Sequence, residues 1–276
     1  MGTYISIDES SLSNGELYTI VTNKAAKGQK GSLIAMIKGT KAETVINVLR
    51  KIPHHLRNNV LEITLDMASS MNLIVDSCFA RAEKVIDRFH VQKLAYDALQ
   101  EMRIKYRWEA IDEETNAIDN AKWKKIEYIP MRFENGDTKK QLLARSRYLL
   151  FKSADRWTDS QKQRARILFA QYPDIKEAYS LTHSLRMIFS HTKVKSVAYT
   201  KLAHWYNKVS ESGFKSFNTI SATIYTHYRG ILNFFNNRST NASAESFNAK
   251  LKAFRTNLRG VCDVTFFLYR VAKIFA

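Results

Sequence analysis

Three short segments near the N-terminus decide the fold class: "YISIDE" (4–9), "LYTIVTN" (17–23) and "SLIAMIK" (32–38). Each is rich in β-branched and aromatic residues, which favour strands. They are separated by "NG" (14–15) and "KGQKG" (27–31), whose residues are typical of tight turns. The pattern predicts a three-stranded antiparallel meander.

The next segments extend this region and add helices. "VLEITLD" (60–66) and "EKVID" (83–87) are predicted as the fourth and fifth strands. The segment 40–52 carries apolar residues at helical spacing, and 70–79 is predicted as a short helix. The N-terminal region is therefore expected to mix strands and helices, an α/β (α+β) fold class.

Beyond the fifth strand the sequence is helical in character. Helices are predicted at 91–106, 138–152, 158–172, 176–190 and 196–210. The acidic segments "DEET" (112–115) and "ENGD" (134–137) are predicted as loops. We expect three parts along the chain: a first part of a core domain at 1–100, an all-helical region at 101–225 and a return to the core at 226–276.

The charge of the chain points to its partner. Among 276 residues, 43 Lys and Arg stand against 26 Asp and Glu, a formal net charge of +17. These bases are spread through the folded segments and are not gathered in a tail, which favours nucleic acid as a partner. A ribosome-like or merely soluble basic protein is the alternative.

The cysteine count and the lengths of the apolar runs exclude further classes of protein. Cys78 and Cys262 are too few for a disulfide framework or a thiolate zinc site. No apolar run approaches the roughly 20 residues of a membrane span, and the N-terminus shows no signal-peptide pattern. We therefore expect a soluble cytoplasmic protein with no membrane partner.

Asp8 and Asp66 are candidates for chemistry because each ends a predicted strand. A side chain there is held by the sheet and projects at its edge. Aspartate is also common where a strand passes into a loop, so neither residue alone indicates catalysis. Together with a third acid, however, the two aspartates could form a metal site.

That third acid is Glu245, in "STNASAESFNAKLKAFR" (239–255). A helix over this segment aligns an apolar stripe made of Ala244, Phe247, Leu251 and Phe254. A second stripe carries Asn241, Glu245, Asn248 and Lys252, with no basic residue three or four positions from the acid on that row. Three distant carboxylates suit two Mg²⁺ ions about 4 Å apart that act on a phosphodiester, with Mn²⁺ as a substitute. A solvated polar face is the alternative.

Several of these segments resemble DDE transposases of bacterial insertion sequences. The matching words are "SIDE" (6–9), "TLDMA" (64–68), "DRFH" (87–90) and "TNASAESFNAKLKAF" (240–254). They are most similar to the ISL-type group. The resemblance implies a ribonuclease H-like core with a large all-helical insertion between the fifth strand and the Glu-bearing helix. It also implies a catalytic, metal-binding triad of Asp8, Asp66 and Glu245.

The resemblance assigns neighbours to the active site as well. Asp87 and His90 match a D-x-x-H motif that lies beside the active site and helps to place the DNA strand; a structural pair at the start of the helix at 91 is the alternative. The other implied neighbours are Asn241, Asn248 and Lys252. The family usually has Gly at the position of Ala242, so the start of this helix is expected to differ.

Basic helices of the expected insertion are candidates for clamping DNA. The candidate phosphate contacts are basic side chains, two of them near Glu245. They are Arg145, Arg147, Lys152, Arg164, Arg166, Lys250 and Arg255. Trp157 is a candidate for stacking on an unpaired base, although tryptophan is more often a packed core residue.

The resemblance implies Mg²⁺-dependent strand cleavage followed by strand transfer to target DNA. A ribonuclease H-like nuclease or resolvase without strand transfer and an inactive DNA-binding remnant are the alternatives. Relatives carry an N-terminal zinc-binding and helix-turn-helix region. Because this chain opens on the first catalytic strand, we expect a separate DNA-recognition polypeptide or a truncation. A homo-oligomer on DNA, associated with the bacterial nucleoid, is also expected.

Overall fold

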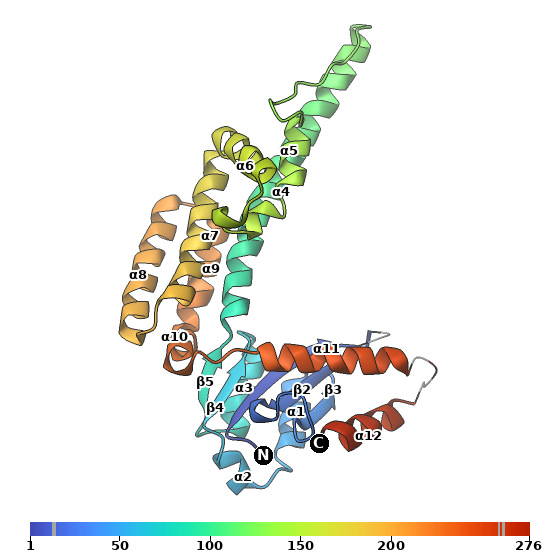
Figure 1. Cartoon of the computed structure of the whole chain (residues 1–276), viewed down its shortest axis with the longest axis vertical. Coiled ribbons are helices and arrows are strands. Elements are labelled where there is room, and N and C mark those ends of the chain that lie inside the picture. The colour runs from blue at the N-terminus through green and yellow to red at the C-terminus, as the bar shows by residue number, and fades with distance from the viewer. Residues whose placement is uncertain (13–14, 259, 261–262) are drawn as a thin grey trace. The chain divides into compact units, whose positions relative to one another are not determined.

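The computed structural model describes the chain except for residues 13–14, 259 and 261–262 (Figure 1). By its internal contacts the chain divides into two compact units. The first unit joins Met1–Val91 to Thr226–Ala276, and the second is the intervening segment Gln92–Tyr225. Among the described residues, no helix is both long and apolar enough to cross a membrane.

The first unit is built on a five-stranded mixed sheet with the order β3-β2-β1-β4-β5. Its strands are β1 (Tyr4–Ser11), β2 (Leu17–Asn23), β3 (Leu33–Lys38), β4 (Glu62–Leu65) and β5 (Glu83–Ile86). The first three form an antiparallel meander, and β4 and β5 run parallel to β1. The predicted meander and all five predicted strands are confirmed. The turn predicted at 14–15 falls partly outside the described residues.

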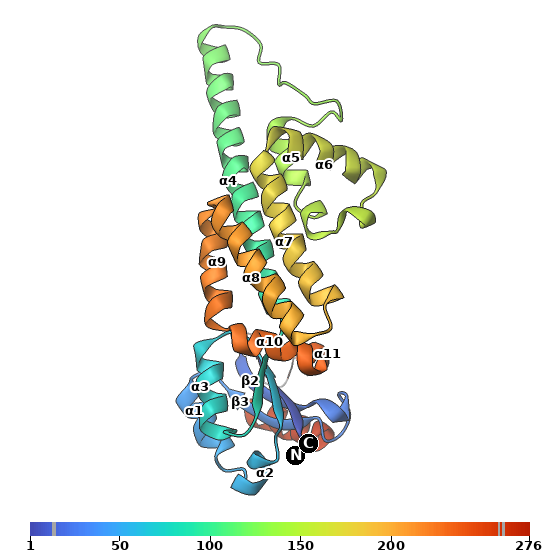
Figure 2. The ribbon, with the colours of Figure 1, turned by 90° about the vertical axis from the view of Figure 1, so that its left-hand side faces the viewer.

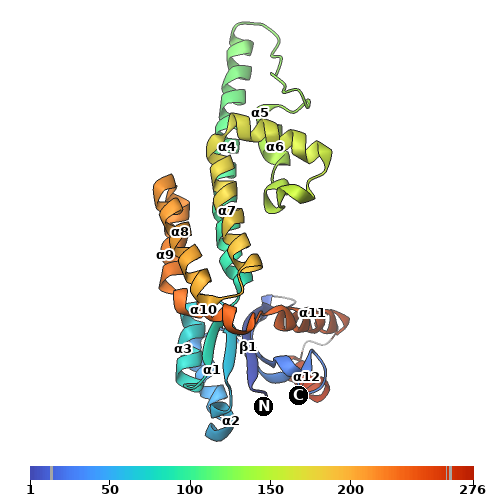
Figure 3. The ribbon, with the colours of Figure 1, turned by 60° about the vertical axis from the view of Figure 1, so that its left-hand side comes forward.

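Helices cover both faces of this sheet. They are α1 (Ala42–Leu49), α2 (His54–Asn58), α3 (Ser69–Cys78), α10 (Tyr228–Asn237), α11 (Ala242–Asn257) and α12 (Val264–Phe275). Figure 3 shows α1 and α3 on one side of the sheet and α11 and α12 on the other. The side of α11 and α12 is closed by an apolar cluster of Leu12, Tyr18, Ile20, Leu33, Phe247, Leu251, Phe267 and Val271. The predicted apolar stripe of α11 is therefore confirmed, with Phe254 packed partly buried against the cluster.

The second unit is all-helical (Figure 2). Its elements are the greater part of α4 (Arg88–Trp123), then α5 (Lys139–Arg145), the short 3-10 turns η3 (Leu149–Phe151) and η4 (Ala154–Arg156), α6 (Asp159–Gln171), α7 (Pro173–His191), α8 (Lys195–Ser212) and α9 (Lys215–Thr226). Side chains tie the helices together: Thr182 on α7 donates to the carbonyl of Ala95 on α4 at 3.2 Å, and Trp205 on α8 donates to that of Leu181 at 2.9 Å.

Two sequence predictions for this unit are wrong. The "DEET" segment (112–115) lies inside α4, which runs for 36 residues, because acidic side chains suit an exposed helix face as well as a loop. The helix predicted at 138–152 ends at Arg145 and gives way to η3. The "ENGD" loop (134–137) and the other predicted helices are confirmed, with shifted ends.

Candidate active site

Three aspartates line up across neighbouring parallel strands of the sheet. Asp66 and Asp87 directly follow β4 and β5, whereas Asp8 lies within β1, which continues to Ser11. The prediction that Asp8 ends its strand is therefore wrong. The residues two positions earlier are register partners: Ser6, Thr64 and Val85. Because side chains alternate along a strand, the row continues to the aspartates on the same face. This is the face of Ile20, the partner of Asp8 on β2, and thus the face that α11 covers.

Asp8 is half-buried and held by two hydrogen bonds. Its Oδ1 accepts the backbone N–H of Glu9 at 2.9 Å, and its Oδ2 accepts the side-chain amide of Asn248 at 2.7 Å. Burial raises the pKa of Asp8, and the charges of Asp66 and Glu245 raise it further, against the lowering effect of the Glu9 N–H and His90. Asp66 and Glu245 therefore both lie within electrostatic range of Asp8.

Asp66 and Glu245 are held differently. Asp66 accepts the N–H of Ala68 at 2.8 Å, which fixes its carboxylate at the start of α3. Glu245 is exposed in the first turn of α11, where a negative charge is favoured by the helix dipole. Asn248, one turn later on the same helix, makes the contact with Asp8. The acid on α11 is thus anchored to β1 through its neighbour.

Asp87 and His90 lie together beside this row. The buried Asp87 accepts the N–H of Phe89 at 3.3 Å, and its Oδ2 is 3.8 Å from Nδ1 of His90. Asp87 therefore accepts a hydrogen bond from the first turn of α4. His90 also acts on the charge of Asp8, so it lies close to the candidate site as well.

Sequence reasoning missed a partly buried lysine on the same face. Lys24, in the 3-10 turn η2 (Lys24–Ala26), hydrogen-bonds to Thr64 and lies 3.4 Å from Glu62 on β4. Glu62 also accepts from Asn237 at 3.0 Å. Burial lowers the pKa of Lys24, while Glu62 and the nearby Asp87 raise it. No sequence pattern marks this network, since it joins residues far apart along the chain.

Glu9 was also missed, although it lies in the quoted segment "SIDE". It projects from the opposite face of β1 to Asp8. Burial raises its pKa, and the charges of Asp66 and Asp8 raise it further. Glu9 is therefore a fourth acid within electrostatic range of Asp66.

The remaining candidates on α11 divide by burial. Asn241 is fully buried at the start of α11, and neither polar atom of its amide has a hydrogen-bond partner among the described residues. Lys252 is exposed. Lys250 donates to the carbonyl of Gly28 at 3.1 Å. Arg255 is only 4% exposed and forms a two-pronged ion pair with Glu16, so its guanidinium is not available to a phosphate.

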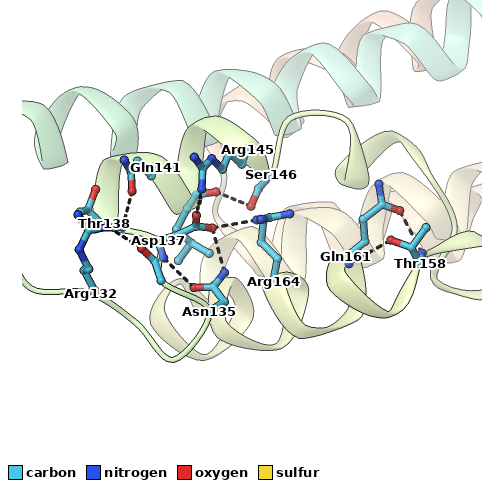
Figure 4. A network of polar contacts seen from close by, with 12 residues as sticks. Arg132, Asn135, Asp137, Thr138, Gln141, Arg145, Ser146, Thr158, Gln161 and Arg164 are labelled. Atoms are coloured by element: carbon cyan, nitrogen blue, oxygen red, sulfur yellow. Dashed lines mark hydrogen bonds and ion pairs between the residues drawn. The ribbon is translucent and has the colours of Figure 1, made fainter.

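Several predicted DNA contacts in the second unit have partners within the fold. Arg145 and Arg164 both bind the buried carboxylate of Asp137 (Figure 4). Arg166 pairs with Glu134 and keeps an exposed side chain. Arg147 lies over the ring of Tyr148, and Lys152 is exposed.

Trp157 is a packing residue in this structure. Its indole N–H donates to the carbonyl of Leu149 at 2.8 Å, and its ring packs against Phe169 and Tyr179. The structure thus places it in an aromatic cluster, in line with the alternative to base stacking.

The donor set of the site fits a hard divalent cation in its chemistry. Carboxylates and amide oxygens are the ligands that Mg²⁺ prefers, and the buried Oδ1 of Asn248 has no hydrogen-bond partner in the described part of the chain. Over the described residues, however, no group of three or more His, Cys, Asp or Glu side chains is positioned to hold a metal ion. The topology brings these acids near one another, but in this conformation their side chains are not grouped closely enough to hold an ion.

Comparisons with known proteins identify the class. The model of the ISL3 family of DDE transposases, described as "Transposase", matches residues 5–271. The chain therefore belongs to the ISL3-type DDE transposase family, which confirms the resemblance seen in the sequence. It is also 22% identical over 275 residues to the "Transposase for insertion sequence element IS1001" of Bordetella parapertussis. That match covers 99% of this chain and 61% of the relative, so the chain spans about three-fifths of the relative's length.

Proposed function

We propose that this chain is the catalytic part of an insertion-sequence transposase that cleaves DNA strands at the element ends and transfers them to target DNA. Membership of the family supports a DNA-processing role. The observation that carries the proposal is the approach of α11 to Asp8 within β1: Asn248 of α11 donates to Asp8 at 2.7 Å, and the charges of Glu245 on that helix and of Asp66 at the end of β4 both act on Asp8. The net charge of +17 supports DNA as the substrate.

The same proposal assigns a ribonuclease H-like core to the first unit. Its support is the sheet order, with a meander extended by two parallel strands. The second unit, Gln92–Tyr225, would be the helical insertion between β5 and the Glu-bearing helix α11. These bounds lie close to the expected parts at 1–100, 101–225 and 226–276.

The residues that would hold Mg²⁺, or Mn²⁺ in its place, are Asp8, Asp66 and Glu245. A divalent ion held by these carboxylates would lower the pKa of the attacking water or hydroxyl and would stabilise the leaving oxygen. Because Glu245 is exposed, its side chain is free to change rotamer toward the aspartates. Asn248 orients Asp8 through its amide donor.

The reaction we propose has two in-line steps. A water oxygen attacks the phosphorus at the element end, which forms one P–O bond, breaks another and frees a 3′-hydroxyl. That hydroxyl then attacks a target phosphodiester with the same balance of bonds. Exposed basic side chains such as those of Lys252 and Lys152 would attract the phosphate backbone of the DNA. A separate DNA-recognition polypeptide and an oligomer on nucleoid DNA belong to the same proposal.

The test is a cleavage and joining assay with labelled element-end DNA and plasmid target in Mg²⁺ or Mn²⁺. The parent, supplied with a DNA-recognition region from the family where needed, should release a 3′-end and join it to the plasmid. Asp66→Asn should abolish both products, and Glu43→Gln, an exposed acid on α1, should leave both unchanged. Nicking without joined product would contradict the transfer step, and parent-like cutting by Asp66→Asn would contradict the site.

A further inference from the structure

A basic pocket opens in the first unit where α3, β5 and the start of α10 meet. The lining residues that matter to its chemistry are Asn72, Lys84, His227, Tyr228, Arg229 and Gly230. They come from one face of α3, from the edge strand of the sheet and from the residues that begin α10. The pocket was not among the sequence predictions, since its members are about 150 residues apart along the chain.

The backbone holds this pocket on rigid elements. A Cβ on Gly230 would lie 2.8 Å from Cγ1 of Ile86, so only glycine lets α10 approach β5 this closely. Asn233 donates to the carbonyl of Lys84 at 2.9 Å, and Asn236 donates to the carboxylate of Glu83 at 3.0 Å. A ligand there would meet a preformed surface.

Two cationic side chains, those of Lys84 and Arg229, are among the described residues that line the pocket, and none of those lining residues is acidic. Lys84 forms an ion pair with Asp76 at 2.8 Å. Arg229 is exposed, and its Nε donates to the hydroxyl of the adjacent Tyr228, at 3.2 Å. In the described part of the chain Arg229 makes no ion pair, so most of its guanidinium donors remain open to a ligand.

The pocket adjoins the candidate active site through Asp66. The carboxylate of Asp66 accepts the N–H of Ala68, and the carbonyl of Ala68 accepts the amide of Asn72, at 3.1 Å. His227 lies close enough to both Asp66 and Lys84 for their charges to act on it in opposite directions. The pocket is therefore a basic surface immediately next to a proposed catalytic carboxylate.

We propose that this pocket binds a backbone phosphate of the DNA strand next to the phosphodiester that reacts at Asp66. The inference rests on the proposed function for the identity of the strand. Arg229 would supply paired donors to the phosphate oxygens, Lys84 a point charge, and Asn72 and Tyr228 neutral hydrogen bonds. Such a contact fixes the register of the strand without reading its sequence.

The test compares two double variants of the full chain. Lys84→Ala with Arg229→Ala removes the pocket charge, and Arg50→Ala with Lys51→Ala removes the same charge from exposed positions at the end of α1. Fluorescence anisotropy with a duplex of about 30 base pairs in EDTA gives Kd at salt concentrations from about 50 to 200 mM. The pocket variant should bind roughly tenfold more weakly, and its salt slope should fall by at least about one unit relative to the control, since Arg229 has no ion-pair partner among the described residues whereas Lys84 is paired with Asp76. Lys84→Arg with Arg229→Lys should keep the parent slope.

The outcomes test the phosphate-binding pocket separately from the proposed function. A pocket variant that matches the control in affinity and slope would overturn the pocket, whether or not the parent cleaves DNA. If the parent shows the pocket-dependent slope but never cleaves DNA in Mg²⁺, the proposed function fails and the pocket stands. A parent that does not bind DNA at all would overturn both. Circular dichroism of the variants excludes unfolding as the cause of a loss, and the charge-preserving variant provides a second check.

Discussion

Substitution of Asp137 tests most directly how the second unit is stabilised. Its buried carboxylate accepts hydrogen bonds from Arg145, from Arg164 at 2.9 Å and from Asn135 at 2.9 Å (Figure 4). Asp137→Asn keeps the shape of the side chain but leaves two guanidinium groups without their anion. Breaking a buried ion pair in this way costs about 3–5 kcal/mol. The exposed Arg145 places the expected loss near the lower limit.

The assay exploits the position of the tryptophans. Trp108, Trp123, Trp157 and Trp205 are the four tryptophans of the chain, and all lie within Gln92–Tyr225. Tryptophan fluorescence during urea unfolding therefore reports on the second unit. The matched control is Asp159→Asn, which removes a fully exposed partner of Lys162 on α6 and should cost no more than about 1 kcal/mol.

The effect of pH adds a second measurement. Burial alone would raise the pKa of Asp137, but the hydrogen bonds and charges of Arg164 and Arg145 outweigh it and lower the pKa. The stabilisation is thus fully present above the unfolded-state pKa of about 4 and is lost as the pH falls through the lower folded-state pKa. The difference between parent and Asp137→Asn should shrink in acid. If Asp137→Asn costs no more than Asp159→Asn at neutral pH, the reasoning is refuted.

Three further changes test the first unit. Lys24→Met should lower the free energy of unfolding by about 3 kcal/mol, because it leaves the buried Glu62 without its cation. Urea unfolding followed by circular dichroism measures this free energy, and an unchanged value would show that the ion pair does not stabilise the first unit. Asn248→Leu should reduce strand cleavage by roughly 10- to 100-fold with the fold retained, since Asp8 loses its amide donor; an unchanged rate would show that the amide does not position it. Gly230→Ala should destabilise by about 1–3 kcal/mol because the new Cβ would press on β5, and thermal stability equal to the parent's would contradict the close approach.

The strands and the α11 stripe followed from local patterns in the sequence. Runs of β-branched and aromatic residues placed β1 to β5 to within a few residues, because strand propensity is expressed over short segments. The apolar spacing of Ala244, Phe247 and Leu251 likewise sets which face of α11 is buried. These features depend on neighbours within one segment.

The row of aspartates could not be predicted from the sequence, because it depends on the order of the strands in the sheet. Asp8, Asp66 and Asp87 align only because β4 inserts next to β1 and β5 next to β4, and strand order is not encoded by any one segment. The partners of Lys24 and Arg255 depend in the same way on long-range packing. Asp137 is the clearest case, since a loop acid decides the orientation of two arginines that the sequence suggested for DNA.

We propose that Asp8, Asp66 and Glu245 act as one catalytic unit. The most direct measurement is the rate of Mg²⁺-dependent strand cleavage for Asp8→Asn, Asp66→Asn, Glu245→Gln and the triple variant, each checked for folding. Residues that work as a unit show strongly non-additive losses. We predict that each single change reduces the rate at least about a hundredfold, to the same background as the triple variant. A single variant that cleaves like the parent, while the triple variant is inactive, would contradict the claim.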